Sequence, residues 1–106
     1  MVMPESASAQ AVLSMPTQTK IRQHHWHDSP QAIGAARFLP TMTMRKLDEL
    51  VKIVLKKGEK MLEGKGARSH RYTFRKSIGY TSSGQRSYSL KVITDEQGSV
   101  ISAYPV

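Results

Sequence analysis

The sequence contains no cysteine, so disulfide bonds and thiolate metal sites are both excluded. It has no run of about eighteen apolar residues and therefore predicts no transmembrane span. The opening MVMPESASAQAVLSMP has neither a basic start nor a continuous apolar stretch, so it is a poor signal peptide. Acidic residues are scarce: 8 Asp and Glu stand against 16 Lys and Arg in 106 residues, a formal charge of +8. That charge favours a polyanionic partner, either a nucleic acid or an anionic membrane surface.

Several common catalytic motifs are also absent. The chain has no GxxxxGK[ST], GxSxG or HExxH, and its acidic residues offer no convincing pair for a two-carboxylate mechanism. His24, His25 and His27 cluster around the only tryptophan, but no acidic or thiolate residue stands at metal-ligand spacing from them. We therefore expect no metal site and no cofactor. The cluster fits either packing at a helix entrance or proton transfer.

The N-terminal part of the chain divides into a polar leader and a short helical segment. Residues 1–20 are rich in Ala, Ser, Gln, Thr and Pro, so we expect a linker or flexible leader there and one domain over residues 21–106. Ser29 is a good helix N-cap and Pro30 a good first helical residue. This pair predicts a short helix that ends at residues 38–40.

The clearest periodic pattern follows. From Thr43 to Glu63 the apolar residues recur at i, i+3, i+4 and i+7, which predicts a long amphipathic helix. A threonine can cap its start, and Gly64 or Gly66 can end it.

After Gly66 the pattern changes to the alternation of strands. RSHRYTFRKS predicts one strand, Ile78 to Tyr80 a short continuation, and residues 81–85 a polar turn. The last nineteen residues predict a β-hairpin, YSLKVIT and SVISAYP, around the turn DEQG. The expected fold is α+β, with N-terminal helices packed on one face of a small antiparallel sheet of three to four strands and the other face open.

Alternation also assigns side chains to the two faces of this sheet. The face under the long helix receives Tyr72, Phe74, Leu90, Val92, Ile101 and Ala103. The open face receives Arg71, Thr73, Arg75, Ser89, Lys91, Ser102 and Tyr104, a basic and hydroxyl-rich set. Ile93 and Val100 fit neither face well, which indicates a bulge or a strand end. A slip of one residue in register would invert a strand.

Imidazoles beside cations fit one metal-free reaction. RNA is cleaved when a base removes the 2′-OH proton and the oxygen attacks the adjacent phosphorus. Histidine titrates near neutral pH and serves as acid or base, while Arg, Lys or hydroxyl donors stabilise the charge on the phosphoryl oxygens. His70 is a fourth candidate for proton transfer, although a solvated loop histidine is the simpler interpretation.

Three sequence features follow one another along the chain. A histidine cluster, RFLPTMT before a long helix, and a hairpin ending in Ser102-Ala103-Tyr104-Pro105 occur in this order. This order resembles the C-terminal toxin domains of polymorphic and contact-dependent growth inhibition systems. Within these it most resembles the metal-independent RNases of the barnase–EndoU–colicin E5–RelE (BECR) superfamily, EndoU-like branch, over residues 21–106. The histidine spacing departs from the EndoU pattern and the usual lysine before the aromatic-Pro segment is missing, so a sister BECR family fits nearly as well.

The resemblance implies a metal-independent endoribonuclease toxin that cleaves RNA, above all tRNA, by 2′-OH attack. It implies delivery from a secreted or cell-surface parent protein into the cytoplasm of a target bacterium, and a cognate immunity protein that is acidic where it covers the toxin. The expected catalytic residues are His24, His25, His27, Arg75, Ser102 and Tyr104. The expected substrate-binding residues are Arg71, Thr73 and Lys91.

Two other functions are compatible with the same residues. One is a non-catalytic nucleic-acid-binding module that uses Tyr80 and Tyr104 as stacking platforms. The other is an RNase toxin of an intracellular toxin–antitoxin pair.

Overall fold

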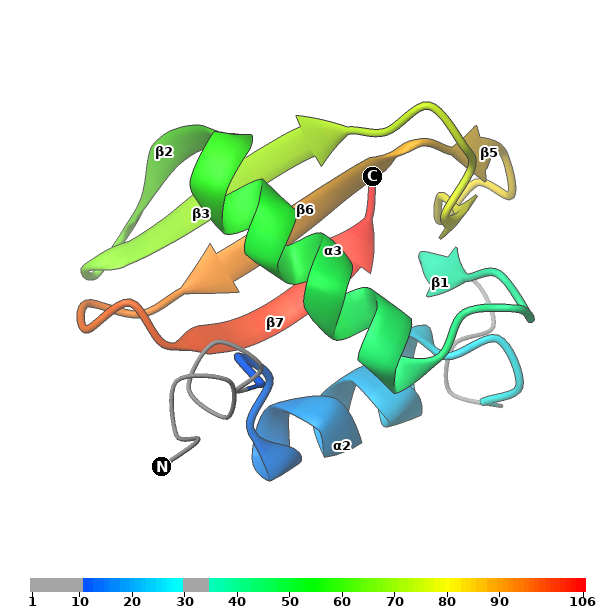
Figure 1. Ribbon diagram of the computed structural model, residues 1–106, viewed down its shortest axis with the longest axis horizontal. Helices are drawn as coiled ribbons and strands as arrows, with labels where there is room; N and C mark the ends of the chain where they lie inside the picture. Colours follow the sequence, from blue (N-terminus) through cyan, green and yellow to red (C-terminus); the bar gives the residue numbers. More distant parts are fainter. Residues whose placement is uncertain (1–10, 30–34) are drawn as a thin grey trace, which may run out of the picture.

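The computed structural model describes residues 11–29 and 35–106 and has the expected α+β fold (Figure 1). Its elements are α2 (Met15–His25), β1 (Arg37–Phe38), α3 (Met44–Lys57), β2 (Glu59–Gly64), β3 (Ala67–Thr73), β4 (Gly79–Tyr80), β5 (Arg86–Ser87), β6 (Ser89–Thr94) and β7 (Val100–Pro105). The larger antiparallel sheet has the order β2-β3-β6-β7, and a small antiparallel sheet has the order β1-β4-β5. The small sheet was not predicted. Residues 79–80 pair with β1 instead of continuing β3.

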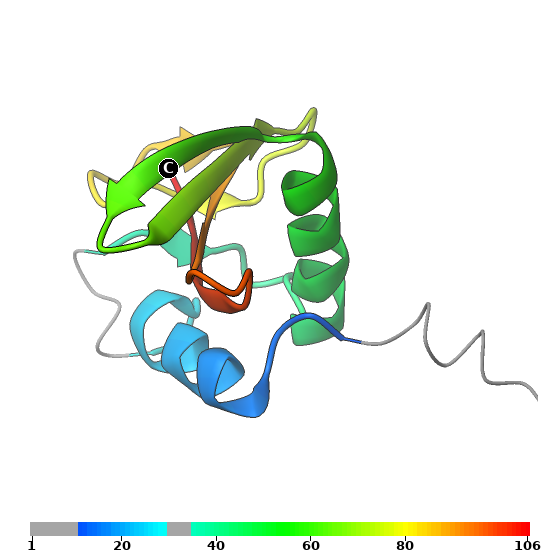
Figure 2. The same cartoon turned by 90° about the vertical axis from the view of Figure 1, so that its left-hand side faces the viewer.

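Helix α3 covers one face of the larger sheet, as Figures 1 and 2 show from two sides. Thr43 caps the helix by accepting a hydrogen bond from the Lys46 amide. The centre of its apolar stripe is buried, and Leu47 and Val51 lie in one core cluster with Leu90 of β6. The predicted helix start and its amphipathic packing are therefore confirmed.

The predicted end of this helix is wrong. Helix α3 stops at Lys57, because the chain turns at Gly58 and passes close to β3. A Cβ at Gly58 would lie 2.6 Å from the Val54 carbonyl oxygen and 2.7 Å from that of Arg71, so only glycine fits there. Residues 59–64 form β2, the outer strand of the sheet. Met61 and Leu62 match the helical period by chance, since they are 65% and 77% exposed.

The expected boundary between leader and domain, residues 20 and 21, falls inside α2 (Met15–His25). Ser14 caps this helix, and Leu13 and Ile21 are 2% and 0% exposed within the core. Only two residues of the helix are buried, so its sequence carries little amphipathic signal. Residues 1–10 and most of the short helix expected after Ser29 lie outside the described residues, and residues 37–38 form β1.

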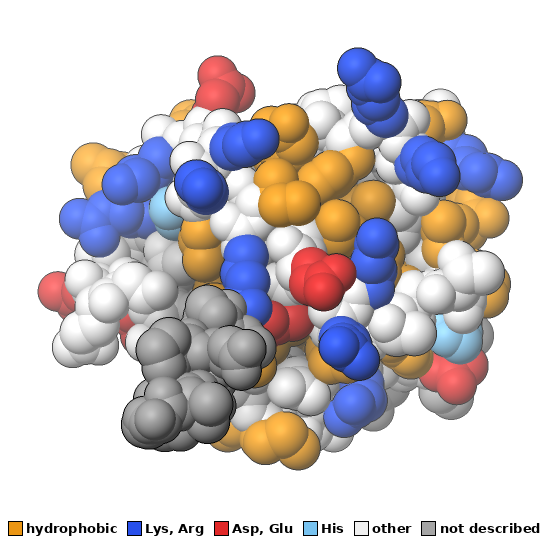
Figure 3. Space-filling model, viewed as in Figure 1, with side chains coloured by type: hydrophobic (Ala, Val, Ile, Leu, Met, Phe, Trp, Pro, Cys, Tyr) orange, Lys and Arg blue, Asp and Glu red, His pale blue; other side chains and the backbone are white. Residues whose placement is uncertain are grey.

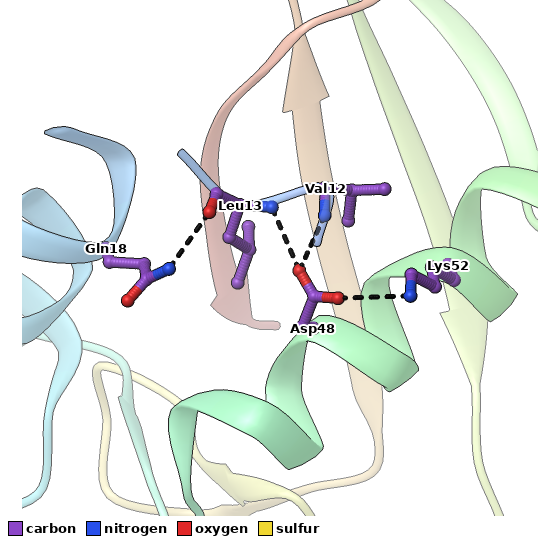
Figure 4. Close-up of polar contacts among 5 residues, drawn as sticks. All are labelled: Val12, Leu13, Gln18, Asp48 and Lys52. Carbon is purple, nitrogen blue, oxygen red and sulfur yellow. Dashed lines mark hydrogen bonds and ion pairs between the residues drawn. The ribbon is translucent and has the colours of Figure 1, made fainter. Parts of the chain in front are cut away.

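A buried carboxylate ties the chain before α2 to α3 (Figure 4). Asp48 Oδ1 accepts hydrogen bonds from the backbone amides of Val12, at 2.8 Å, and Leu13, at 2.9 Å. Its Oδ2 lies 3.4 Å from Lys52 Nζ, one turn later on the same helix. Gln18 donates to the Leu13 carbonyl oxygen at 2.9 Å. These contacts fix the entry of the chain into α2.

The terminal hairpin forms as predicted, with a bulge in its second strand. Gly98 has φ of 87° in the connecting turn, a conformation that favours glycine. Ile93 pairs with Ser102 and Thr94 with Val100, so Ile101 is the extra residue of a bulge. Val100 is 5% exposed and takes the inward position that the sequence assigned to Ile101, which is only half-buried. The assignment of Ile101 to the core face is therefore wrong.

None of the described helices is both long and apolar enough to cross a membrane.

Replacing Asp48 with Ala should lower the free energy of unfolding by about 2–3 kcal/mol, because it leaves two backbone amides without their charged acceptor. Glu49→Ala changes the exposed neighbour and removes the same charge. It should change stability by less than about 0.5 kcal/mol. Urea denaturation followed by circular dichroism measures both values, and equal stabilities of the two variants would contradict this role of Asp48.

Candidate functional site

A transverse row of side chains crosses the face of the larger sheet that lies away from α3. The strand register places Arg71 opposite Lys91, and Lys91 opposite Tyr104. Residues directly opposite one another in antiparallel strands have neighbouring side chains on one face. The row therefore brings two cations beside one phenol, as the alternation of residues predicted. Glu59 of β2 continues the row beyond Arg71.

Helix α2 lies beside the edge strand β7 (Figure 1). It adds a histidine to this row. The ring of His25 stacks on the ring of Tyr104, with centroids 5.0 Å apart and an interplanar angle of 28°. Thr17 donates to the Val100 carbonyl oxygen at 2.9 Å, and Lys20 to that of Ile101 at 3.3 Å. The helix is thus fixed to the strand at several points along its length.

The hydrogen bond of His25 fixes which of its nitrogens carries a proton. Nδ1 lies 2.7 Å from the Ala36 carbonyl oxygen, which only accepts, so Nδ1 donates. In the neutral ring Nε2 then holds the free lone pair. Burial lowers the pKa of His25 below its ordinary value, the bond to Ala36 raises it, and the charge of His24 lowers it. The net lowering favours a neutral imidazole, the form that acts as a base.

The other two histidines of the cluster occupy different surroundings. His24 is exposed, with its ring centroid 6.4 Å from that of His25. His27 lies 5.8 Å from the Trp26 ring and lines a separate surface pocket with Arg37 and Tyr80. Only His25 stacks on Tyr104, so the three candidates do not form one group.

The remaining polar residues of the open face lie beside the row. Ser102 is half-buried and points to the same side as Tyr104, but it stands opposite Ile93 in the next row. Thr73 and Ser89 hydrogen-bond each other at 2.7 Å. Lys91 Nζ lies 3.9 Å from a carboxylate oxygen of Glu63, which partly balances its charge.

The prediction that Arg75 lies on the open face is wrong. Strand β3 ends at Thr73. Beyond its end, side chains no longer alternate between the two faces of the sheet, so this rule does not place Arg75. Arg75 lines an apolar pocket of about 540 Å³ with Lys46 and Leu50, so it lies with α3 instead of with Tyr104. Figure 3 shows that Lys and Arg also spread over the α3 side of the molecule. Positive charge alone does not single out the open face.

Two contributions to the site have no signal in the sequence. The Ala36 carbonyl, which orients His25, is a backbone group that any residue would supply. Lys20 Nζ reaches the Ile101 carbonyl oxygen because α2 lies against the bulge of β7. Both depend on contacts between distant segments.

His70 is buried, contrary to its interpretation as a solvated loop residue. Its Nε2 hydrogen-bonds Thr94 Oγ1 at 3.1 Å, across β3 and β6. Burial lowers its pKa, and the charges of Lys60 and Arg68 lower it further. Its neighbour Arg71 faces the opposite side of the strand, so His70 lies away from the row of Tyr104.

Within residues 11–29 and 35–106, no three His, Asp or Glu side chains are grouped so that they could hold a metal ion. Comparison with family models, curated proteins and solved structures finds no match to this chain. The resemblance to toxin RNases therefore depends on the sequence motifs alone.

The two lowered histidine pKa values predict a pH dependence of stability. An unfolded histidine takes up a proton near pH 6.5, whereas His25 and His70 in the folded protein do so only at lower pH. The unfolded state then binds more protons, so stability should fall as pH is lowered from about 7.5 to about 5.5. His70→Gln, whose amide keeps a partner for Thr94, should make this fall shallower. Urea denaturation over this pH range measures the free energy of unfolding of the wild type and of His70→Gln. Parallel curves of this free energy against pH would contradict the prediction.

Proposed function

We propose that this chain is a metal-independent endoribonuclease of the BECR-like toxin class. The observation that carries the proposal is the His25 ring, whose Nε2 is free to accept a proton and which stacks on Tyr104. Tyr104 stands in one row with Lys91 and Arg71. A base beside two cations on one open sheet face supplies two of the functions that cleavage by 2′-OH attack uses, proton removal and stabilisation of the phosphoryl charge.

In the proposed reaction, His25 Nε2 removes the proton of a ribose 2′-OH. The oxygen attacks the adjacent phosphorus, and the bond from phosphorus to the 5′-oxygen breaks. That oxygen leaves with a proton from an acid, for which protonated His24 is the nearest imidazole to His25 among the described residues. The products are a 2′,3′-cyclic phosphate and a 5′-OH end. Lys91 and Arg71 stabilise the negative charge on the phosphoryl oxygens.

The proposal also includes the substrate class and the biological setting. The net charge of +8 supports a polyanionic substrate, and we take structured RNA, tRNA above all, as that substrate. Delivery into the cytoplasm of a target bacterium, and inhibition by an immunity protein that is acidic at its contact surface, follow from the resemblance to toxin domains.

A non-catalytic RNA-binding module would use the same surface. The orientation of His25 favours the enzyme, because binding alone does not require a histidine whose Nδ1 is fixed and whose Nε2 is left free. An enzyme and a binding module differ in whether RNA is cut.

Purified protein should cleave total RNA in the presence of EDTA and leave 2′,3′-cyclic phosphate ends. His25→Ala should slow cleavage by about 10²- to 10⁴-fold, the usual contribution of a general base, while RNA binding persists. The variant purified in the same way controls for contaminating RNases. If the wild-type protein leaves the RNA intact, and if wild type and His25→Ala bind it equally well, the chain is a binding module instead. Ends that carry a 5′-phosphate would contradict 2′-OH attack.

Lys91→Met should slow cleavage by about 10²-fold through kcat, because it removes a cation from the developing phosphoryl charge. Lys57→Met removes the same charge from an exposed position at the end of α3. It should change the rate by less than about three-fold, through long-range attraction alone. Single-turnover kinetics on one tRNA measures both variants. An equal loss in the two would mean that Lys91 acts only through net charge.

A further inference from the structure

A second concave site lies beside His25 and takes no part in the proposed proton transfer. It is a pocket of about 400 Å³ whose lining includes His27, Ala35, Arg37, Tyr80, Ser82 and Gly84. Its volume falls within the range of about 300–1,000 Å³ that is usual for small-molecule sites. It is formed where β1 pairs with β4 and where the turn after β4 folds over them.

The pocket is rich in hydrogen-bond donors. Arg37 is half-buried at its wall, and within the described part of the chain its guanidinium forms no hydrogen bond or ion pair. His27 and the hydroxyl of Ser82 add further polar groups. None of the described lining residues is acidic. A half-buried arginine without an acidic partner favours a ligand that brings hydrogen-bond acceptors.

An aromatic side chain stands in the same wall. Tyr80 is half-buried and lines the pocket, and Arg86 lies over its ring at 5.9 Å from the centroid. A planar base can stack on such a ring whatever its sequence context. Arginine pairs in bidentate fashion with N7 and O6 of guanine, an edge that carries two acceptors and no donor.

The pocket and the His25 site share one backbone segment. Ala35 and Arg37 line the pocket, and the carbonyl of Ala36, between them, holds His25 Nδ1. The pocket and His25 are therefore neighbours, and an RNA strand with a phosphate at His25 can extend an adjacent base toward the pocket.

We infer that this pocket is a guanine subsite, in which Arg37 reads the Hoogsteen edge of the base next to the cleaved phosphate and Tyr80 stacks on it. The inference rests on the proposed RNase function for its biological meaning. It adds to that function a sequence preference for guanine beside the cut. Binding to the pocket is measurable without catalysis.

The binding test uses guanosine 3′-monophosphate, with uridine 3′-monophosphate as the comparison. In amide NMR spectra the guanosine nucleotide should shift Arg37, Tyr80 and Gly84 and should bind at least five-fold more tightly than the uridine nucleotide. Arg37→Ala should remove this preference. Arg37→Lys keeps the charge but lacks the planar fork, and it should remove the preference while keeping the fold. Arg75→Ala, in the other pocket, should bind as the wild type does.

The cleavage test separates this inference from the proposed function. Sequencing of RNA ends should show guanine enriched beside the cut for the wild type and Arg75→Ala, and not for Arg37→Lys. His25→Ala should slow cleavage by about 10²- to 10⁴-fold and still bind guanosine 3′-monophosphate. Cleavage with the same base preference in wild type and Arg37→Lys would overturn the guanine subsite and leave the RNase proposal intact. Absence of cleavage with binding at Arg37 and Tyr80 would overturn the RNase proposal and support the subsite. Equal shifts with both nucleotides, or shifts outside the pocket, would overturn the subsite.

Discussion

The attachment of α2 to the edge strand β7 is the constraint on which the candidate site depends. The bulge at Ile101 interrupts the regular ladder, and the carbonyls of Val100 and Ile101 accept hydrogen bonds from Thr17 and Lys20 of the helix. With its first half held in this way, α2 can only end beside Tyr104, where His25 stacks. The helix also covers a strand edge that would otherwise offer unpaired backbone groups to other chains. One contact surface thus protects the sheet and positions the proposed base.

Two further features hold this arrangement in place. Asp48 of α3 binds the backbone just before α2 and so ties the entry of that helix to α3. The Ala36 carbonyl holds the other end of α2 through His25. Between these anchors the register of β3, β6 and β7 sets Arg71 and Lys91 in line with Tyr104. Arg37 lines a pocket that adjoins the row through Ala36, whereas Lys46, Arg75 and Lys76 line a different pocket.

The site was partly predictable because alternation along a strand is a local property. Lys91, Ser102 and Tyr104 were assigned to the open face from parity alone, and the register agrees. The same reasoning failed for Arg75, where the strand had already ended, and for Ile101, where a bulge shifts the phase. Parity holds only while the strand is regular, and neither the end of a strand nor the position of a bulge has a reliable local signature.

By itself the sequence determined the α+β class, the amphipathic start of α3, the terminal hairpin and the absence of any thiol chemistry. These follow from periodicity, turn residues and composition, which act over a few neighbouring residues. Only the tertiary structure decided that α3 ends at Gly58, since the reason is the approach of the Arg71 carbonyl from another strand. It likewise decided that residues 11–20 belong to the folded body and that His25, among the three clustered histidines, meets Tyr104. Each of these depends on a contact between segments far apart in the chain, and no local pattern encodes such a contact.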